Sequence, residues 1–229
     1  MAGKLYGIGV GPGDPELITL KALRLMKECD VIAVPGKDPS DSIALKIAMG
    51  AYPEIKDKEL LLIATPMTKD MKVLKEAYVN GAKLVEKALD EGKSVGLLTL
   101  GDPTVYSTYI YIQRNVVADG YEAEIVSGIT SFCAVSAKFG DSLVDRHEPL
   151  HVIPASYQIE EALKLPGTKV LMKAGSKLNE VKKVLKDNNC EAVMIENCGM
   201  ENEKMYHSTD EIPDQGSYYS LTIVKEKTK

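Results

Sequence analysis

The chain has 229 residues, of which 45% are hydrophobic and 27% charged, a composition typical of a globular protein with one large or two small domains. The formal net charge of −5 argues against nucleic-acid binding, because phosphate recognition requires a concentrated basic face. The sequence shows no apolar run of the roughly 20 residues that span a membrane, and no signal-peptide pattern at its N-terminus. We therefore expect a cytoplasmic protein that binds neither nucleic acid nor membrane.

Short apolar strands alternate with amphipathic helices through the first half of the chain. The expected strands are 5–10, 31–34, 59–64 and 94–100. The expected helices are 16–29, 40–51, 70–89 and one that follows Pro103 and ends near residue 119. Asp14 is a suitable N-cap for the first helix, with Pro15 at its first position. Apolar strands connected through helices predict a largely parallel sheet that is covered on both faces.

After Gly120 the pattern changes. The expected strands are 122–126, 150–155, 168–173, 191–196, 204–208 and 218–225, and the expected helices are 130–139, 158–164 and 177–188. Because the last two strands have no helix between them, we expect antiparallel pairing and a mixed sheet. We place the domain boundary near residues 115–121, which gives an N-terminal α/β domain over 1–118 and a C-terminal α/β domain over 119–229.

The cysteines and histidines do not have the spacing of a metal site. The cysteines are Cys29, Cys133, Cys190 and Cys198, and none forms a C-x-x-C pair. We expect them to be reduced, buried thiols. The histidines are His147, His151 and His207, and Pro149 between the first two favours a loop over a helix that would align them. We expect no resident metal.

The first glycine-rich motif runs from Gly7 to Pro15 and reads GIGVGPGDP. Glycines at a strand-to-helix turn allow the backbone to approach a ligand closely. The motif does not fit the dinucleotide pattern G-x-G-x-x-G, because the third glycine position holds Pro12 or Asp14, depending on the starting glycine. The next strand also lacks the acidic residue that would bind a ribose.

Two further glycine turns follow strands. The first reads TLGDPTVYS over 99–107, at the carboxyl end of a strand, which is where open α/β sheets bind ligands. Asp102 in this turn is either a carboxylate for a ligand or only a turn residue and helix cap. The second turn reads SGITSF over 127–132, and its serine and threonine are also typical helix caps.

Together these three motifs, in this order and spacing, resemble the tetrapyrrole methylase family over essentially the whole chain. The segments at 101–112, 170–175, 196–206 and 218–224 are most similar to the branch that methylates carbon 20 of precorrin-2 or cobalt-factor II. The resemblance implies two α/β domains with the active site in the cleft between them, S-adenosylmethionine as methyl donor, a tetrapyrrole acceptor and a homodimer.

The resemblance also implies site residues. Those expected to bind S-adenosylmethionine are Pro12, Leu100, Gly101, Asp102, Val105, Thr130, Ser131, Lys173 (or its neighbour Ala174), Cys198 and Ser220 (or its neighbour Tyr219). The candidate acceptors for the proton lost from the ring carbon are Asp102, ranked first, Tyr106 and Tyr109. The basic residues considered for the substrate carboxylates are Arg114, Lys138, Arg146 and Lys173. Tyr106, Tyr109 and Tyr111 stack on the macrocycle or pack within a helix layer.

Three alternatives stay open. The chain is another tetrapyrrole methylase, such as a uroporphyrinogen III or different precorrin methyltransferase; or diphthine synthase, which shares the three motifs; or a catalytically silent nucleotide-binding scaffold. A methyl-transfer assay with each acceptor separates the enzymes, and S-adenosylmethionine binding without transfer identifies the scaffold.

Overall fold

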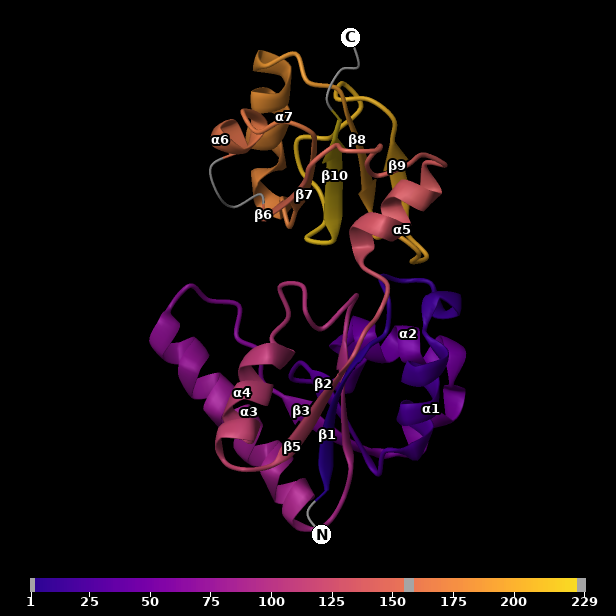
Figure 1. Ribbon diagram of the computed structural model, residues 1–229, viewed down its shortest axis with the longest axis vertical. Coiled ribbons are helices and arrows are strands. Elements are labelled where there is room, and N and C mark those ends of the chain that lie inside the picture. The colour runs from indigo at the N-terminus through magenta and orange to yellow at the C-terminus, as the bar shows by residue number, and fades with distance from the viewer. Residues whose placement is uncertain (1–2, 155–158, 226–229) are drawn as a thin grey trace. The chain divides into compact units, whose positions relative to one another are not determined.

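The computed structural model describes residues 3–154 and 159–225, apart from the side chain of Ser176. The ends of two expected elements, residue 155 of a strand and residue 158 of a helix, lie outside these ranges. The described chain divides into two compact units, the first ending at Thr130 and the second beginning at Ser131. Each unit contains one five-stranded sheet (Figure 1).

The first sheet is entirely parallel, with the order β3-β2-β4-β1-β5. Its strands are β1 (Lys4–Gly9), β2 (Val31–Pro35), β3 (Glu59–Ile63), β4 (Val95–Thr99) and β5 (Glu122–Val126). The helices are α1 (Leu20–Glu28), α2 (Ile43–Ala51), α3 (Met71–Asp90) and α4 (Tyr109–Ala118). One face packs on α1 and α2, and the other packs on α3 and α4 (Figure 1). The strands are apolar on both sides because both faces are covered.

The first two expected helices are shorter than the sequence pattern indicates. Asp14 accepts a hydrogen bond from the Glu16 amide, but it caps only a short 3-10 helix, Pro15–Leu17. Ile18 is then extended, and Thr19 caps α1 through the Ala22 amide at 3.1 Å. Similarly, the 3-10 helix Pro39–Asp41 precedes α2. A third 3-10 helix, Pro53–Asp57, follows α2. Proline at the first or second position starts each of these three short turns.

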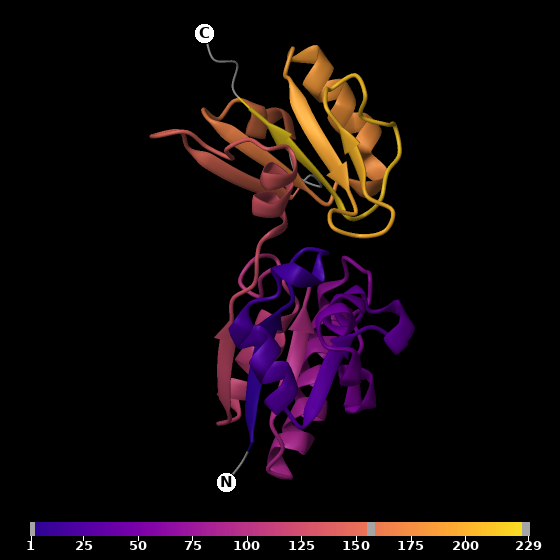
Figure 2. The same cartoon turned by 90° about the vertical axis from the view of Figure 1, so that its right-hand side faces the viewer.

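The second sheet is mixed, as expected, with the order β6-β7-β10-β8-β9. Its strands are β6 (Leu150–Pro154), β7 (Thr168–Met172), β8 (Ala192–Glu196), β9 (Lys204–Tyr206) and β10 (Ser220–Val224). The helices are α5 (Ser131–Lys138), α6 (Ile159–Leu163) and α7 (Leu178–Asp187), and a 3-10 turn, Gly175–Lys177, precedes α7. Only β6 and β7 are parallel, whereas β10 is antiparallel to both β7 and β8. Helices α6 and α7 cover one face and α5 packs on the other (Figure 2).

The boundary between the units corrects the expected one. The strand β5 pairs in parallel with β1, from Lys4↔Glu122 to Ile8↔Val126, so it completes the first sheet. The first unit therefore extends to Thr130 rather than to residue 118. A strand's sequence does not identify the sheet that it joins, and this accounts for the error.

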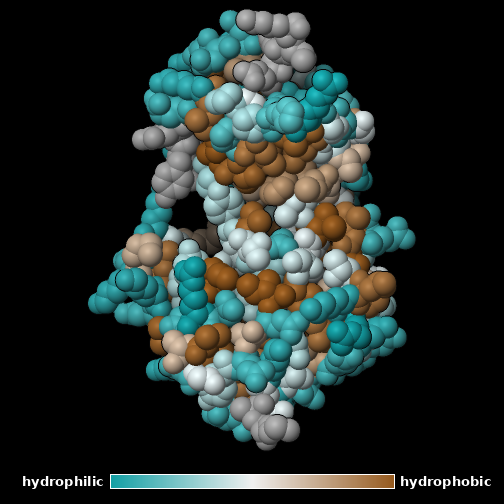
Figure 3. All heavy atoms as spheres, in the orientation of Figure 1, coloured by the Kyte–Doolittle hydropathy of each residue, from teal (hydrophilic) through white to brown (hydrophobic). Residues whose placement is uncertain are grey.

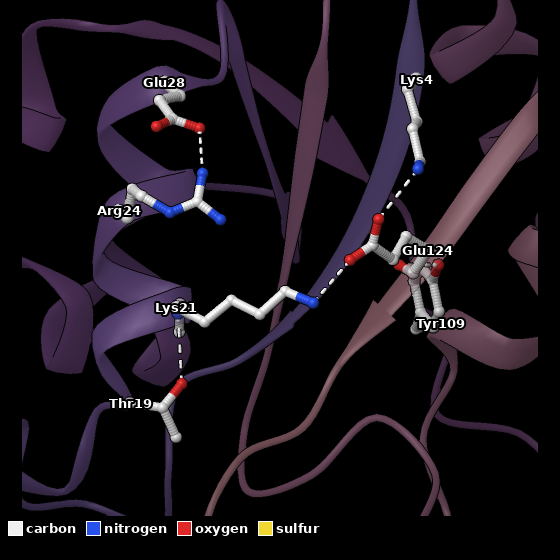
Figure 4. Close-up of polar contacts among 8 residues, drawn as sticks. Lys4, Thr19, Lys21, Arg24, Glu28, Tyr109 and Glu124 are labelled. Atoms are coloured by element: carbon white, nitrogen blue, oxygen red, sulfur yellow. Dashed lines mark hydrogen bonds and ion pairs between the residues drawn. The ribbon is translucent and has the colours of Figure 1, made fainter.

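Ion pairs connect the edge strand β5 to its neighbours. Glu124 accepts from Lys4 of β1 at 2.8 Å and from Lys21 of α1 at 2.7 Å, and Figure 4 shows the two lysines approaching its carboxylate. The hydrogen bonds from Lys21 and Lys4 lower the pKa of Glu124 from 4.5 to about 2. On α1, Arg24 pairs with Glu28 one turn later at 2.6 Å, also drawn in Figure 4.

The Glu124 ion pairs predict an acid-dependent contribution to stability. Because folding lowers the pKa of this carboxyl, its contribution is complete above the usual value of 4.5 and is lost as the pH falls toward 2. Glu124→Gln should lower the melting temperature by about 1–2 °C at neutral pH, since the pairs are partly exposed to solvent. The difference from wild type should narrow as the pH falls from about 4.5 to about 2. Thermal unfolding followed by circular dichroism measures both values, and a difference that stays constant with pH contradicts the assignment.

The cysteines are all free, but they are not all buried. Cys29 and Cys198 are buried, Cys190 is partly buried and Cys133 is exposed, which corrects the expectation of four buried thiols. Cys133 is in α5, whose buried residues Ala134, Val135 and Ser136 place this position on the opposite side of the helix. Burial raises the pKa of the Cys29 thiol from 9.0 to about 12.

Thiol reactivity should follow this order. In native protein at neutral pH, a disulfide reagent should modify Cys133 first, whereas Cys29 should react only after unfolding, because the thiolate is the reactive species. Mass spectrometry of peptides after timed labelling identifies each site. The matched variant Cys133→Ser should lose the fastest phase, and rapid labelling of Cys29 contradicts its burial.

The described histidines make separate contacts. The Nε2 atom of His151, in β6, lies 3.0 Å from the Pro166 carbonyl oxygen, and the ring of His207 packs edge-on against Phe139. Within residues 3–154 and 159–225, no three His, Cys, Asp or Glu side chains gather as a metal site would require. No helix in these ranges combines the length and apolar character needed to cross a bilayer.

Candidate active site

Three glycine turns meet at the carboxyl edge of the first sheet. They follow β4, β1 and β5, which are neighbours in the sheet, so motifs far apart in the sequence become adjacent. In parallel α/β sheets this edge is where ligands bind. The sequence therefore predicted both the three turns and the edge at which they lie.

Backbone hydrogen bonds join the first two turns. The amide of Gly101 donates to the Gly11 carbonyl at 2.8 Å, and the amide of Gly11 donates to the Gly101 carbonyl at 3.3 Å. The Val10 amide also donates to the Thr99 carbonyl at 2.9 Å. Gly11 and Gly101 have φ values of 77° and 72°, in the left-handed region where glycine is favoured. The two turns thus form one rigid backbone surface.

Gly9 and Gly128 lie so close to Gly101 that neither of them leaves room for a side chain. A Cβ atom on Gly128 would lie 2.1 Å from the Gly101 carbonyl oxygen, and one on Gly9 would lie 2.7 Å from the same oxygen. Both distances are far below van der Waals contact. We call these three residues the glycine junction. It connects the turns after β1, β4 and β5.

Asp102 stabilises the glycine junction through buried hydrogen bonds. Its Oδ1 accepts from the Thr104 amide at 2.7 Å and from the Thr104 hydroxyl at 2.5 Å, and its Oδ2 accepts from the Gly128 amide at 3.0 Å. Burial disfavours the charged form, but the hydrogen bonds from Thr104, Gly128 and Ser127 outweigh it and lower the pKa of Asp102. A carboxylate that is satisfied and only weakly basic is a poor proton acceptor. These contacts favour a positioning role for Asp102 over the proton-accepting role that the sequence ranks first.

Tyr109 is also unsuited to the catalytic role expected for it. Its side chain is 1% exposed, its ring packs against Gly7, and its hydroxyl donates to the Glu124 carbonyl at 3.0 Å (Figure 4). Burial raises its pKa well above the usual range. By contrast, Tyr106 lies on the loop itself, is 50% exposed and has a φ of 49°. Tyr111 stacks on Tyr78 of α3, with ring centroids 4.7 Å apart, so it packs between helices.

The other expected residues of the first unit lie on the three turns. Pro12 and Gly101 are buried, and Leu100, Val105 and Thr130 are partly buried. The Thr130 hydroxyl is buried, and it has no hydrogen-bond partner among the described residues. A buried, unsatisfied hydroxyl costs free energy unless a ligand or water satisfies it. A polar group of a ligand at this edge would satisfy it.

The expected residues of the second unit also share one edge of their sheet. Lys173 and Cys198 follow β7 and β8, and Ser220 begins the antiparallel strand β10, so all three lie at the same end. Cys198 is buried and packs with the core on the α5 face. Ser220 is 3% exposed, and its hydroxyl lacks a partner within the described part of the chain. Ser131 is the first residue of α5.

The basic residues considered for substrate carboxylates have varied surroundings. The Arg114 guanidinium lies 5.9 Å from the Tyr111 ring, and Lys138 pairs with Glu203 at 3.2 Å. Arg146 is on a loop with a φ of 43°. The Lys173 ammonium lies 5.9 Å from the centre of the Tyr218 ring. Of the four, only Lys173 lies beside other candidate site residues of its unit.

Sequence patterns did not identify Glu196, Asn197 and Ser217, which build this edge of the second unit. Glu196 and Asn197 are 6% and 9% exposed, although both are polar. The available signal was a glutamate at the end of an apolar strand, followed by the asparagine. Their partner Ser217 is about 20 residues away in the chain, too far for local spacing to indicate the contact.

The fold is that of an α/β protein with two units, and glycine turns line the carboxyl edge of its first sheet. These turns do not have the sequence pattern of a dinucleotide-binding site. The family model for tetrapyrrole (corrin/porphyrin) methylases matches residues 4–212. The chain belongs to this methyltransferase family.

Relatives and solved structures agree with this assignment. The probable cobalt-precorrin-2 C(20)-methyltransferase of Methanocaldococcus jannaschii is 37% identical, over 97% of this chain and 96% of its own. The cobalt-precorrin-2 C(20)-methyltransferase of Salmonella typhimurium is 30% identical, over 99% of this chain and 98% of the relative. The crystal structure of uroporphyrin-III C-methyltransferase from Thermus thermophilus complexed with S-adenosylhomocysteine has a TM-score of 0.70 and 22% identity, over 98% of both chains, and it supports the fold.

Proposed function

We propose that the protein transfers a methyl group from S-adenosylmethionine to carbon 20 of precorrin-2 or cobalt-factor II in cobalamin biosynthesis. The observation that carries the proposal is similarity along nearly the whole chain, at 30% and 37% identity, to relatives named for C(20) methylation of cobalt-precorrin-2. The three motifs alone are shared with siblings that act elsewhere. Full-length similarity is therefore what favours carbon 20.

The carboxyl edge of the first sheet fits S-adenosylmethionine. The glycine junction holds the three turns together at this edge, and the Thr130 hydroxyl has no partner among the described residues. The residues that would hold the cofactor are those on the turns: Pro12, Leu100, Gly101, Val105, Thr130 and Ser131. When bound, the sulfonium supplies an electrophilic methyl group. The task of the protein is to hold donor and acceptor in line, which accounts for a large share of the barrier reduction in such reactions.

The roles of single residues follow from the site. Asp102 positions the loops and does not accept the proton, since Thr104 and Gly128 already occupy its oxygens. Of the three candidates named from the sequence, Tyr106 is the one whose exposure and position allow contact with a substrate. We therefore assign Tyr106 a contact with the substrate through its hydroxyl group.

The substitution Tyr109→Phe tests whether Tyr109 has no catalytic role. We expect turnover close to that of wild type, because the hydroxyl is buried and contacts only backbone among the described residues. The free energy of unfolding should fall by about 1 kcal/mol, the usual cost of one lost hydrogen bond. Steady-state kinetics and urea denaturation measure the two effects. A large loss of kcat with normal stability returns Tyr109 to the list of catalytic residues.

The decisive experiment is an acceptor assay. Purified protein is incubated with methyl-labelled S-adenosylmethionine and, in separate reactions, with precorrin-2, cobalt-factor II, uroporphyrinogen III and a protein acceptor of diphthine synthase. We expect label at carbon 20 of one of the first two, located by NMR. Label at another carbon indicates a sibling enzyme, transfer only to a protein acceptor indicates diphthine synthase, and cofactor binding without transfer indicates a scaffold.

The proposal includes a cytoplasmic homodimer, as in the family. On the face drawn in Figure 3, hydrophobic side chains form patches between hydrophilic ones on each unit. Large apolar side chains are exposed, among them Leu20 at 86% and Met67 at 89%. Light scattering coupled to gel filtration should give twice the chain mass of 24.9 kDa.

A further inference from the structure

Two adjacent tyrosines are exposed at the same edge of the second sheet as Lys173. Tyr218 and Tyr219 are 45% and 38% exposed, and their rings meet edge to face, with centroids 5.3 Å apart and planes at 86°. The Lys173 ammonium lies 5.9 Å from the Tyr218 ring centre. Exposed aromatic side chains that are held beside a cation mark a binding surface more often than a packing accident. We call these three residues the tyrosine–lysine cluster.

A buried hydrogen-bond network fixes the backbone of the two tyrosines. Glu196 accepts from the Ser217 amide at 2.9 Å, and Asn197 accepts from the Ser217 hydroxyl at 2.8 Å. The Ser217 hydroxyl in turn accepts from the Tyr219 amide at 3.1 Å, and the Asn197 amide donates to the Tyr219 carbonyl at 3.0 Å. Because Glu196 and Asn197 are buried, these hydrogen bonds hold the backbone that carries the two exposed rings.

The backbone of Lys173, the third residue of the cluster, has an uncommon conformation. Lys173 has a φ of 60°, a conformation uncommon for a residue other than glycine. It directly follows β7, and the register Leu221↔Met172 places it opposite the start of β10, where the tyrosines lie. A strained, non-glycine backbone that presents a cation is a feature associated with functional sites.

We propose that the tyrosine–lysine cluster binds the tetrapyrrole substrate, with the rings contacting the flat macrocycle and Lys173 pairing with one of its carboxylates. The inference rests on the proposed function and assigns Lys173 to the substrate rather than to the cofactor. Aromatic faces suit a large conjugated ring. An ammonium group suits a carboxylate. S-adenosylmethionine also carries an aromatic ring and a carboxylate, so binding of the two ligands is measured separately.

Binding measurements test the proposal separately from turnover. The variants are Tyr218→Ala, Tyr219→Ala and Lys173→Ala, and each is compared with its conservative counterpart Tyr218→Phe, Tyr219→Phe or Lys173→Arg. The matched control is Lys27→Ala. Lys27 is in the last turn of α1, outside the candidate site, and its ammonium lies at a similar distance, 5.5 Å, from the centre of a tyrosine ring, that of Tyr52. The probes are uroporphyrin III, a flat porphyrin with several carboxylates, followed by absorbance, and S-adenosylhomocysteine, followed by calorimetry.

We expect the tyrosine-to-alanine variants to raise the Kd for the porphyrin roughly fivefold to tenfold. The phenylalanine variants and the Lys27 control should remain within about twofold of wild type. Lys173→Ala should weaken porphyrin binding and reduce its salt dependence, since a partly exposed ion pair is screened by salt. The Kd for S-adenosylhomocysteine should be unchanged in every variant, which also shows that each variant is folded.

The other outcomes overturn the proposal in distinguishable ways. If S-adenosylhomocysteine binding weakens as much as porphyrin binding, the cluster belongs to the cofactor site. If neither changes while wild type binds both, the tyrosines are surface residues, and the proposed function is unaffected. If wild type binds S-adenosylhomocysteine but no porphyrin, both this inference and the tetrapyrrole substrate are wrong.

Discussion

Gly128→Ala is expected to abolish measurable binding of S-adenosylmethionine. The new methyl group would lie 2.1 Å from the Gly101 carbonyl oxygen and 3.0 Å from Gly9, and both neighbours are backbone that cannot rotate away. The turns after β1, β4 and β5 must therefore separate. We expect the Kd to rise at least roughly a hundredfold and the free energy of unfolding to fall by about 1–3 kcal/mol, the usual cost of overpacking.

Gly120→Ala is the matched control for this substitution. Gly120 also lies in a loop of the first unit, with a φ of 95°, but nothing lies within 4 Å of a Cβ built there. The variant should lose about 1 kcal/mol of stability from backbone strain while its cofactor affinity stays normal. Calorimetry with S-adenosylhomocysteine and urea denaturation separate the two effects. Normal affinity in Gly128→Ala would show that the glycine junction is not the cofactor surface.

Local sequence patterns were sufficient to predict most of the fold. The run 31–34 is apolar at every position and the run 94–100 at most positions, and the structure places them in β2 and β4, covered on both faces. The helix starts were harder to predict, because Pro15 begins a 3-10 turn before α1. The predicted position of the domain boundary differs from the observed one for another reason. The strand β5 pairs with β1, which lies more than a hundred residues earlier in the chain.

The candidate site was predicted as a set of loops, but not as a set of contacts. The glycines of each motif were evident, whereas the approach of Gly128 to Gly9 and Gly101 depends on strand order, which no motif encodes. Tyr109 is instructive, because its burial could have been inferred. It lies three and seven residues before Ile112 and Val116, the other buried residues of α4, and this spacing is typical of one helix face.

Asp102→Asn is the substitution that best separates positioning from proton transfer. The amide keeps the size of the side chain, but its NH₂ group must now face a donor, either the Thr104 amide or the Gly128 amide. One buried hydrogen bond becomes a repulsive contact, which typically costs about 1–3 kcal/mol. Because Asp102 connects two turns of the candidate site through the Gly128 amide, we expect the KM for S-adenosylmethionine to rise roughly tenfold to a hundredfold, with a smaller change in kcat.

The opposite kinetic pattern identifies a base. If Asp102 accepts the ring proton, the variant should keep its cofactor affinity, lose most of kcat and lose the acidic limb of the pH–rate profile. Thr104→Val provides the matched control, because it removes one hydroxyl donor to the same carboxylate and leaves both backbone donors in place. Its KM should rise less than that of Asp102→Asn.

Since the hydrogen bonds hold the pKa of Asp102 below its usual value, wild-type cofactor affinity should not depend on this group between about pH 5 and about pH 8. A cofactor Kd that weakens in step with a group titrating in that range would show that the carboxylate is not held as the structure indicates.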